Sequence, residues 1–293
     1  MLGSVNSELF QTISDFPGVL MIEPYGKVVF YGDVQTPAIK ASNSSVYPEG
    51  AWDLGVTGKG VNVAIVDTGI DNEHPGLEGK FVAGFDAVCT DDVDLTNSEN
   101  TTSLFNQILE KEGKIDICVA NAGNYPQESI PLWDIDDSRW SNTVATNLSL
   151  TFNTAREFLK HASKTKKGSL VLVGSTAGIY GEAGHSDYAA AKGAITSGFL
   201  RTLKNEAAQI GDGVRVNAVA PGWTVTQKKI EEGLDQKHVD KVVSTMALKK
   251  LATPEDVANS IVMLASDFLS GHITGQIIEI AGGMEGRLIT GIT

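Results

Sequence analysis

The residues of this sequence best suited to chemistry are a tyrosine and a lysine, Tyr188 and Lys192, in the stretch DYAAAKGAITSGFLRTLKNEAA. The stretch has a helical pattern, and residues four apart on a helix project from the same face. An ammonium group beside a phenol favours the phenolate, so the pair predicts a pKa of Tyr188 below its ordinary value of about 10. Such a tyrosine can exchange a proton with an alcohol or carbonyl oxygen. A lone Tyr-x-x-x-Lys pair also occurs by chance on solvated helix faces, so the pair alone does not decide the function.

Two further polar residues lie upstream, where the same chemistry needs them. Ser175 closes the apolar run SLVLVGS, and the carboxyl ends of strands are where open α/β sheets bind ligands. Its hydroxyl could hydrogen-bond the same substrate oxygen and steady the charge that develops there. Asn147, in VATNLSLTF, falls inside a helical stretch, where asparagine is a poor helix former. It predicts a packed kink or a water site. The alternatives are a turn residue for Ser175 and a satisfied core amide for Asn147.

The elements that must hold these residues alternate between strands and helices. Near-continuously apolar strands separated by helices indicate a parallel sheet covered on both faces, so the expected fold class is α/β, doubly wound. The expected strands are 61–66, 81–88, 115–119, 169–173, 214–219 and 276–281. The expected helices are 98–112, 137–163, 187–209, 229–246 and 254–268, the last with Thr253 as N-cap and Pro254 at its first position.

Composition excludes several classes of protein. A net charge of −13 with no offsetting Lys/Arg run disfavours nucleic-acid binding. The longest apolar runs are strand-sized, which disfavours a membrane span, and MLGSVNSELF lacks the features of a signal peptide. Cys89 and Cys118 lie in strand-like contexts, so buried free thiols are expected rather than a disulfide or a metal site. These features predict an acidic cytoplasmic protein without a metal.

Motifs after residue 89 agree with one another in order and spacing. They are NAG at 121–123, Asn147, Ser175, YAAAK at 188–192, RVNAVAPG at 215–222 and TGQIIEIAGG at 274–283. Through them the chain resembles the short-chain dehydrogenases/reductases over about residues 89–287. The resemblance implies a Rossmann-like fold and hydride transfer between NAD or NADP and a small carbonyl or alcohol substrate. It also implies a homodimer or homotetramer built with the helices at 187–209 and 137–163.

The same resemblance implies a role for each matching residue. Tyr188 would be the acid/base, Ser175 would orient the substrate, and Lys192 would tune Tyr188 and hold the nicotinamide ribose. Asn147 would position a water that relays protons. The residues implied to bind the cofactor are Asp94 at the adenine, Asn121, Ala122 and Gly123 along its length, and Pro221, Gly222 and Thr226 at the nicotinamide carboxamide, together with Lys192.

The opening of the chain departs from that family. The family's first strand should run into Thr-Gly-x-x-x-Gly-x-Gly, whose backbone approaches the cofactor pyrophosphate at a helix N-terminus. Here the strand VNVAIV runs into DTGIDNEHPG. Residues 50–80 resemble the start of a subtilisin-like serine protease, in which Asp67 matches the catalytic aspartate and His74-Pro75 a structural motif. Residues 1–40 resemble the tail of a propeptide. The motifs that would supply a protease's histidine and serine are absent from the sequence.

The sequence therefore predicts a chimera with three parts. Residues 1–50 are an appendage and linker, 51–88 a subtilisin-like strand-loop-strand segment that supplies the first strand of the sheet, and 89–293 the dehydrogenase-like catalytic part. The leading function is an oxidoreductase whose cofactor binding is weakened by the missing glycine loop. Two alternatives stay open: a catalytically inactive chimera or binding scaffold, and, with only Asp67 in its favour, a serine protease.

Overall fold

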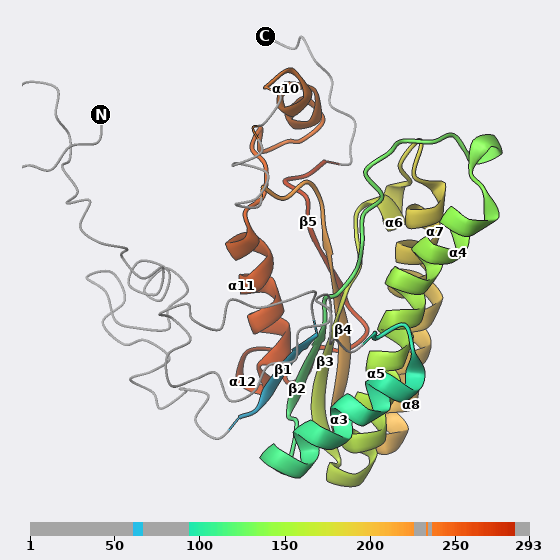
Figure 1. The fold of residues 1–293 in the computed structure, drawn as a ribbon. Coiled ribbons are helices and arrows are strands. Elements are labelled where there is room, and N and C mark those ends of the chain that lie inside the picture. The colour runs from blue at the N-terminus through green and yellow to red at the C-terminus, as the bar shows by residue number, and fades with distance from the viewer. Residues whose placement is uncertain (1–60, 67–93, 226–232, 234–235, 285–293) are drawn as a thin grey trace, which may run out of the picture. The chain divides into compact units, whose positions relative to one another are not determined.

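A computed structural model describes the chain over residues 61–66, 94–225, 233 and 236–284. Five strands in this part of the chain form one sheet in the order β1-β2-β3-β4-β5, and every neighbouring pair is parallel (Figure 1). All their carboxyl ends therefore meet at the same edge. The strands are β1 (Val63–Val66), β2 (Ile117–Ala120), β3 (Lys167–Val173), β4 (Gly213–Pro221) and β5 (Ile277–Ile280).

The central strands are apolar throughout because both faces of the sheet are buried. Successive side chains of a strand point to opposite faces. On β3, Leu170 and Leu172 accordingly belong to one core cluster, and Val171 and Val173 to the other. All four are at most 7% exposed.

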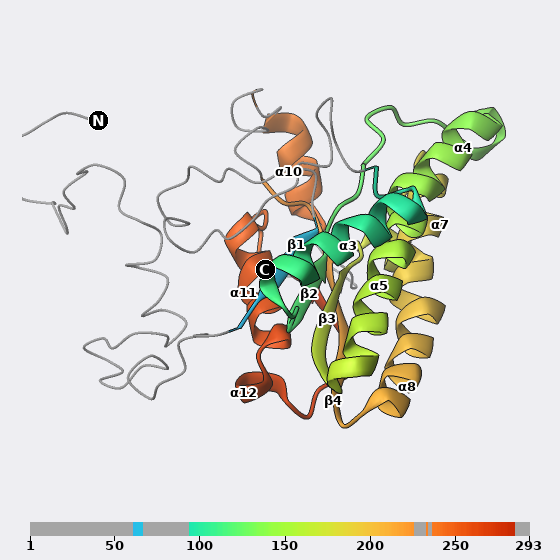
Figure 2. The ribbon, with the colours of Figure 1, turned by 60° about the horizontal axis from the view of Figure 1, so that its bottom comes forward.

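Three helices cover the first face: α3 (Ser98–Glu112), α5 (Leu150–Thr165) and α8 (Leu200–Ile210) (Figures 1 and 2). Phe105, Phe158 and Leu200 bring one side chain from each helix into the cluster of Leu170 and Leu172. On the opposite face lies α11 (Pro254–Ala265), whose Leu264 and Ala265 pack with Val171 and Val173. The doubly wound, Rossmann-like α/β class predicted from the sequence is confirmed.

Both long helices expected over the site contain one turn of π-helix. The stretch 137–163 consists of α4 (Asp137–Val144), η3 (Ala145–Ser149) and α5, and the stretch 187–209 consists of α7 (Ser186–Ala194), η4 (Ile195–Phe199) and α8. Single π turns inside α-helices are frequent at functional sites. The irregularity predicted at Asn147 is confirmed as η3.

The remaining elements agree with the sequence in part. Thr253 caps α11 with a full capping box, and Pro254 opens the helix, as predicted. That helix ends at Ala265 rather than 268, because the Ser266 side chain caps a separate short helix, α12 (Asp267–Ser270). The predicted helix 229–246 is described only as α10 (Gln236–Ser244), and the predicted strand 81–88 lies outside the described residues. Two short helices were not predicted, η2 (Leu132–Asp134) and α6 (Ala177–Tyr180).

Within the described ranges, no helix has the length and apolar character needed to span a bilayer. Cys118 of β2 is a fully buried free thiol, as predicted, and burial raises its pKa to about 12. Cys89 lies outside the described residues.

Candidate active site

The carboxyl ends of β2, β3 and β4 surround a cavity of about 210 Å³. Its lining includes seven residues predicted from the sequence: Asn121, Gly123, Ser175, Tyr188, Lys192, Pro221 and Gly222. They come from four separate segments of the chain. The parallel sheet gathers them because the ends of its strands lie side by side.

Helix α7 carries the central pair. Tyr188 and Lys192 lie one turn apart on it, and the Lys192 ammonium lies 5.8 Å from the centre of the Tyr188 ring. Lys192 is 4% exposed, and its Nζ donates a hydrogen bond to the carbonyl oxygen of Val173 at 3.0 Å. This hydrogen bond to the end of β3 therefore fixes the position of the Lys192 ammonium relative to Tyr188.

The turn after β3 brings Ser175 to the tyrosine. Ser175 Oγ accepts a hydrogen bond from the N–H of Ala177 at 3.2 Å, and its hydroxyl hydrogen-bonds Tyr188. Helix α6 after this turn lies against α7, where a Cβ on Gly178 would fall 2.4 Å from the backbone nitrogen of Gly193. Only a glycine allows this approach, which holds Ser175 and Tyr188 together.

The pKa of Tyr188 differs from the sequence expectation. Burial raises it above its ordinary value, the hydrogen bond from Ser175 lowers it, and the charge of Glu182 raises it further. The predicted lowering by Lys192 is wrong for the protein alone, because desolvation of the phenolate outweighs the stabilising contacts. Tyr188 is therefore protonated at neutral pH.

Asn147 closes the inner end of the site. It is fully buried in the π turn η3, and its Nδ2 donates to the carbonyl oxygens of Asn124 at 2.9 Å and Thr143 at 3.0 Å. Its Oδ1 is buried without a hydrogen-bond partner. A Cβ on Gly123 would lie 2.8 Å from this oxygen and 3.1 Å from Lys192 Nζ, so the backbone at Gly123 passes close to both groups. The amide, the ammonium and the strand end thus form one polar cluster.

Besides Asn147, two of the described residues predicted from the sequence, Ala122 and Asp94, are not among those that line the cavity. Ala122 is buried at the end of β2. Asp94 is exposed and lies in the segment before α3, where its carboxylate accepts hydrogen bonds from the N–H and the hydroxyl of Thr96. Thr226 lies outside the described residues, as do Asp67 and His74 of the protease-like segment.

Beside the predicted residues lies a group of three that the sequence analysis did not single out. The Tyr125 ring stands edge-on to Tyr188, with ring centres 5.0 Å apart, and stacks on the buried His185 at 4.7 Å. The Tyr125 hydroxyl donates to Glu182 Oε1 at 2.6 Å. These three residues come from loops without periodicity. The only available signal was that Tyr125 follows the NAG motif and that the other two shortly precede Tyr188.

A buried ion pair beside Tyr188 was also missed. Asp187 is fully buried, and its Oδ2 accepts hydrogen bonds from Arg139 Nε at 3.0 Å and the Thr143 hydroxyl at 2.9 Å. Burial raises the pKa of Asp187, but these bonds, with one from the backbone of Tyr188, outweigh burial and hold it below its usual range. The arginine also donates to the carbonyl oxygens of Glu128 and Gly184, so it joins α4 to the loops on both sides of the cavity.

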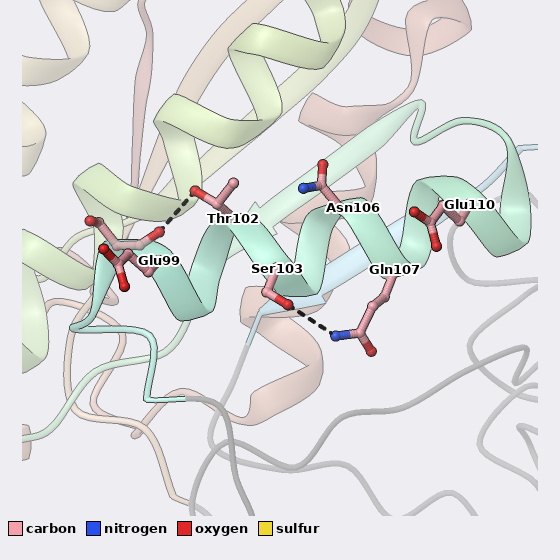
Figure 3. Close-up of a pocket in the computed structure, with 7 residues that line it drawn as sticks. Glu99, Thr102, Ser103, Asn106, Gln107 and Glu110 are labelled. Atoms are coloured by element: carbon pink, nitrogen blue, oxygen red, sulfur yellow. Dashed lines mark hydrogen bonds between the residues drawn. The ribbon is translucent and has the colours of Figure 1, made fainter.

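A larger hollow, of about 520 Å³, lies on the outer face of α3 (Figure 3). Among the described residues, the side chains that line it, including Glu99, Thr102, Asn106 and Glu110, all belong to that one helix. It brings together none of the predicted site residues. Ligand sites are lined by groups that converge from several elements, so we place the candidate active site at the smaller cavity.

The fold and this cavity define the class: a Rossmann-like α/β protein with a tyrosine and a lysine in a cavity at the carboxyl edge of its sheet. The comparisons with known proteins give the family. A family model described as enoyl-(acyl carrier protein) reductase matches residues 55–285. The chain belongs to this short-chain dehydrogenase/reductase family.

Individual relatives agree with this assignment. The chain is 34% identical over 192 residues, 66% of this chain and 75% of the relative, to the 3-oxoacyl-[acyl-carrier-protein] reductase FabG of Thermotoga maritima. It is 28% identical over 250 residues, 85% of this chain and 97% of the relative, to the FabG of Buchnera aphidicola. The solved structure of ElxO with NADP bound superposes with a TM-score of 0.67 at 24% identity, over 76% of this chain and 98% of that one. This likeness shows the shared fold.

The family match begins earlier than the sequence predicted. It takes in residues 55–88, which include β1 and most of the segment that resembles a protease. The origin of residues 1–88 from a subtilisin-like protein stays a prediction.

Proposed function

We propose that the protein is a nicotinamide-dependent oxidoreductase that transfers a hydride between NAD or NADP and a small carbonyl or alcohol substrate. The observation that carries the proposal is the meeting of Ser175, Tyr188 and Lys192 in one cavity at the carboxyl ends of the strands. The FabG relatives, whose name states that they reduce 3-oxoacyl groups on a carrier protein, support it.

In this proposal Tyr188 is the catalytic acid and base. Its raised pKa keeps the phenol protonated at neutral pH, which suits donation of a proton to a carbonyl oxygen as the carbonyl is reduced. The Ser175 hydroxyl hydrogen-bonds the same oxygen and stabilises the charge that develops on it. Proton transfer and charge stabilisation thus act on a single atom.

In this proposal Lys192 and Asn147 help to return protons to Tyr188. Asn147 Oδ1, buried and without a partner, is an acceptor for a water molecule near the lysine. Such a water would return a proton to Tyr188 after each turnover. This role agrees with the buried position of the amide in a π turn.

The residues around the cavity fit the nicotinamide end of the cofactor. The backbone at Gly123 leaves no room for a Cβ beside Asn147 and Lys192, and Asn121, Pro221 and Gly222 line the same space. We infer that Lys192 holds the ribose and that Asn121, Ala122, Gly123, Pro221, Gly222 and Thr226 line the nicotinamide half, with Asp94 at the adenine. When bound, the nicotinamide supplies or accepts the hydride.

The sequence where the family binds the cofactor pyrophosphate differs in this chain. Asp67 and Asp71 follow the first strand where glycines would cradle the pyrophosphate. We propose that this substitution weakens cofactor binding and that residues 1–88 are a protease-derived segment in a chimera. We further propose a homo-oligomer that works in the cytoplasm.

The second candidate is a folded but inactive chimera or binding scaffold, and the missing glycine loop favours it. Titration with NADH and NADPH, followed by turnover with a panel of ketones, separates the two. Binding with cofactor oxidation supports the oxidoreductase, whereas a folded protein without binding or turnover supports the scaffold. Labelling by an active-site-directed phosphonate would instead indicate a protease.

A further inference from the structure

Tyr125 lines the cavity, and Glu182 and His185 contact its hydroxyl and its ring. We call Tyr125, Glu182 and His185 the tyrosine wall. Tyr125 meets Tyr188 edge-on at 5.0 Å, lies on the ring of His185 and is 37% exposed. One side of its ring is therefore fixed by the protein, while part of its surface remains open toward the position that a substrate of Tyr188 would occupy.

The tyrosine wall is held rigidly to the helix that bears Tyr188. His185 Nε2 lies 3.1 Å from the carbonyl oxygen of Pro126, and since that oxygen can only accept, Nε2 carries the hydrogen. The N–H of Ile130 donates to the carbonyl oxygen of Gly184 at 2.9 Å. These bonds join the loop after β2 to the loop before α7. The wall is thus pre-organised relative to the reacting tyrosine, as a specificity-determining surface must be.

The charges around the wall are distributed unevenly. Glu182 is 30% exposed, and its carboxylate accepts the Tyr125 hydroxyl. Two cations are described nearby. Arg139 forms an ion pair with the buried Asp187. Lys192 is 4% exposed, and its Nζ donates a hydrogen bond to the carbonyl oxygen of Val173. Glu182 is therefore the most exposed of these three charges and contributes a negative potential beside Tyr125, whereas the buried Lys192 is the charge that lines the cavity.

We propose that the tyrosine wall selects an uncharged carbonyl substrate: Tyr125 positions the group next to the carbonyl, and Glu182 disfavours a substrate with an anionic group there. This inference rests on the proposed function and narrows its substrate class. A neutral ester or thioester next to the reacting ketone can lie against the Tyr125 ring. A free carboxylate in the same place meets the like charge of Glu182.

A matched substrate pair tests the proposal. The probes are a β-keto ester and the corresponding free β-keto acid, which share the reacting ketone and differ in one charge. The parent should give a kcat/KM at least about tenfold higher for the ester, and Glu182→Gln should reduce this ratio at least about fivefold, mainly through the KM of the acid. Glu110→Gln, on the outer face of α3 (Figure 3), removes the same charge far from the cavity and should leave the ratio unchanged.

Tyr125 has its own pair of variants. Tyr125→Ala should raise the KM of the ester at least about fivefold, and Tyr125→Phe, which keeps the ring, should change it less than about twofold. If the parent turns over no ketone, the proposed function fails, and ligand-observed NMR of the same ester and acid still measures their relative affinity in parent and Glu182→Gln. The proposal is overturned if the parent favours the acid or if Glu182→Gln and Glu110→Gln give the same ratio in either readout.

Discussion

Replacement of Arg139 by methionine should destabilise the folded protein by about 3 kcal/mol, because it leaves a buried carboxylate without its counter-charge. Asp187 is fully buried, and among the described residues the arginine Nε at 3.0 Å is its only cationic partner. The Thr143 hydroxyl at 2.9 Å remains in the variant, and its neutral bond does not replace the ion pair. Methionine keeps much of the apolar stem of the arginine, so the loss of folding stability reflects mainly the removal of the positive charge.

This free-energy loss is measurable as a shift in thermal unfolding. About 3 kcal/mol corresponds to a fall in Tm of about 6–12 °C for a domain of this size. The double variant Arg139→Met/Asp187→Asn removes the stranded charge and should recover at least about 1 kcal/mol relative to the single variant. Calorimetry or urea unfolding of the parent and both variants measures this. A single variant within about 1 °C of the parent, or a double variant less stable than the single one, would refute the reasoning.

Three further results are expected. Burial, and secondarily the charge of Lys164, lowers the pKa of His161 against an opposing effect of Asp116, and its Nε2 accepts the N–H of Ile115. The unfolded chain then binds more protons below about pH 6.5, so the parent should lose stability between pH 7 and 5. His161→Gln should lose less, and equal losses would contradict this. The affinity for the cofactor should be about a thousandfold below that of a site with an intact glycine loop, because carboxylates replace charge-assisted hydrogen bonds of roughly 1.5–3 kcal/mol each. Saturation at low micromolar NADH or NADPH would contradict this weak binding. Light scattering should give a homodimer or homotetramer, and Phe152→Asp, on the exposed side of α5, should shift it toward monomer. A monomeric parent would rule out this assembly.

The sequence predicts the sheet well because the pattern of buried strands is local. β2 to β5 are visible as apolar runs, and α11 is visible from Thr253 and Pro254, whose capping box the structure contains. The break at Ser266 was missed because the apolar pattern continues across it, whereas the side chain of this serine caps a new helix. Helix bounds set by a single hydrogen bond are beyond such patterns.

Within the candidate site, spacing identifies residues that sit on strands and helices but not the contacts between loops. Tyr125 and Glu182 meet through a hydrogen bond between loops that lie 57 residues apart in the chain. The direction of the Tyr188 pKa was also beyond the sequence. It depends on how strongly the tyrosine is desolvated, and a Tyr-x-x-x-Lys spacing contains no information about that.

The central proposal is hydride transfer assisted by Tyr188, and isotope transfer tests it most directly. NADPH and NADH carrying deuterium at the transferable position are incubated with a ketone, and the alcohol product is analysed by mass spectrometry. The parent should place the deuterium on the carbinol carbon. Tyr188→Phe keeps the ring but loses the exchangeable proton, and it should slow this transfer at least about a hundredfold while remaining folded. A parent that yields no deuterated alcohol, or a Tyr188→Phe variant that transfers deuterium at the parent's rate, would contradict the proposal.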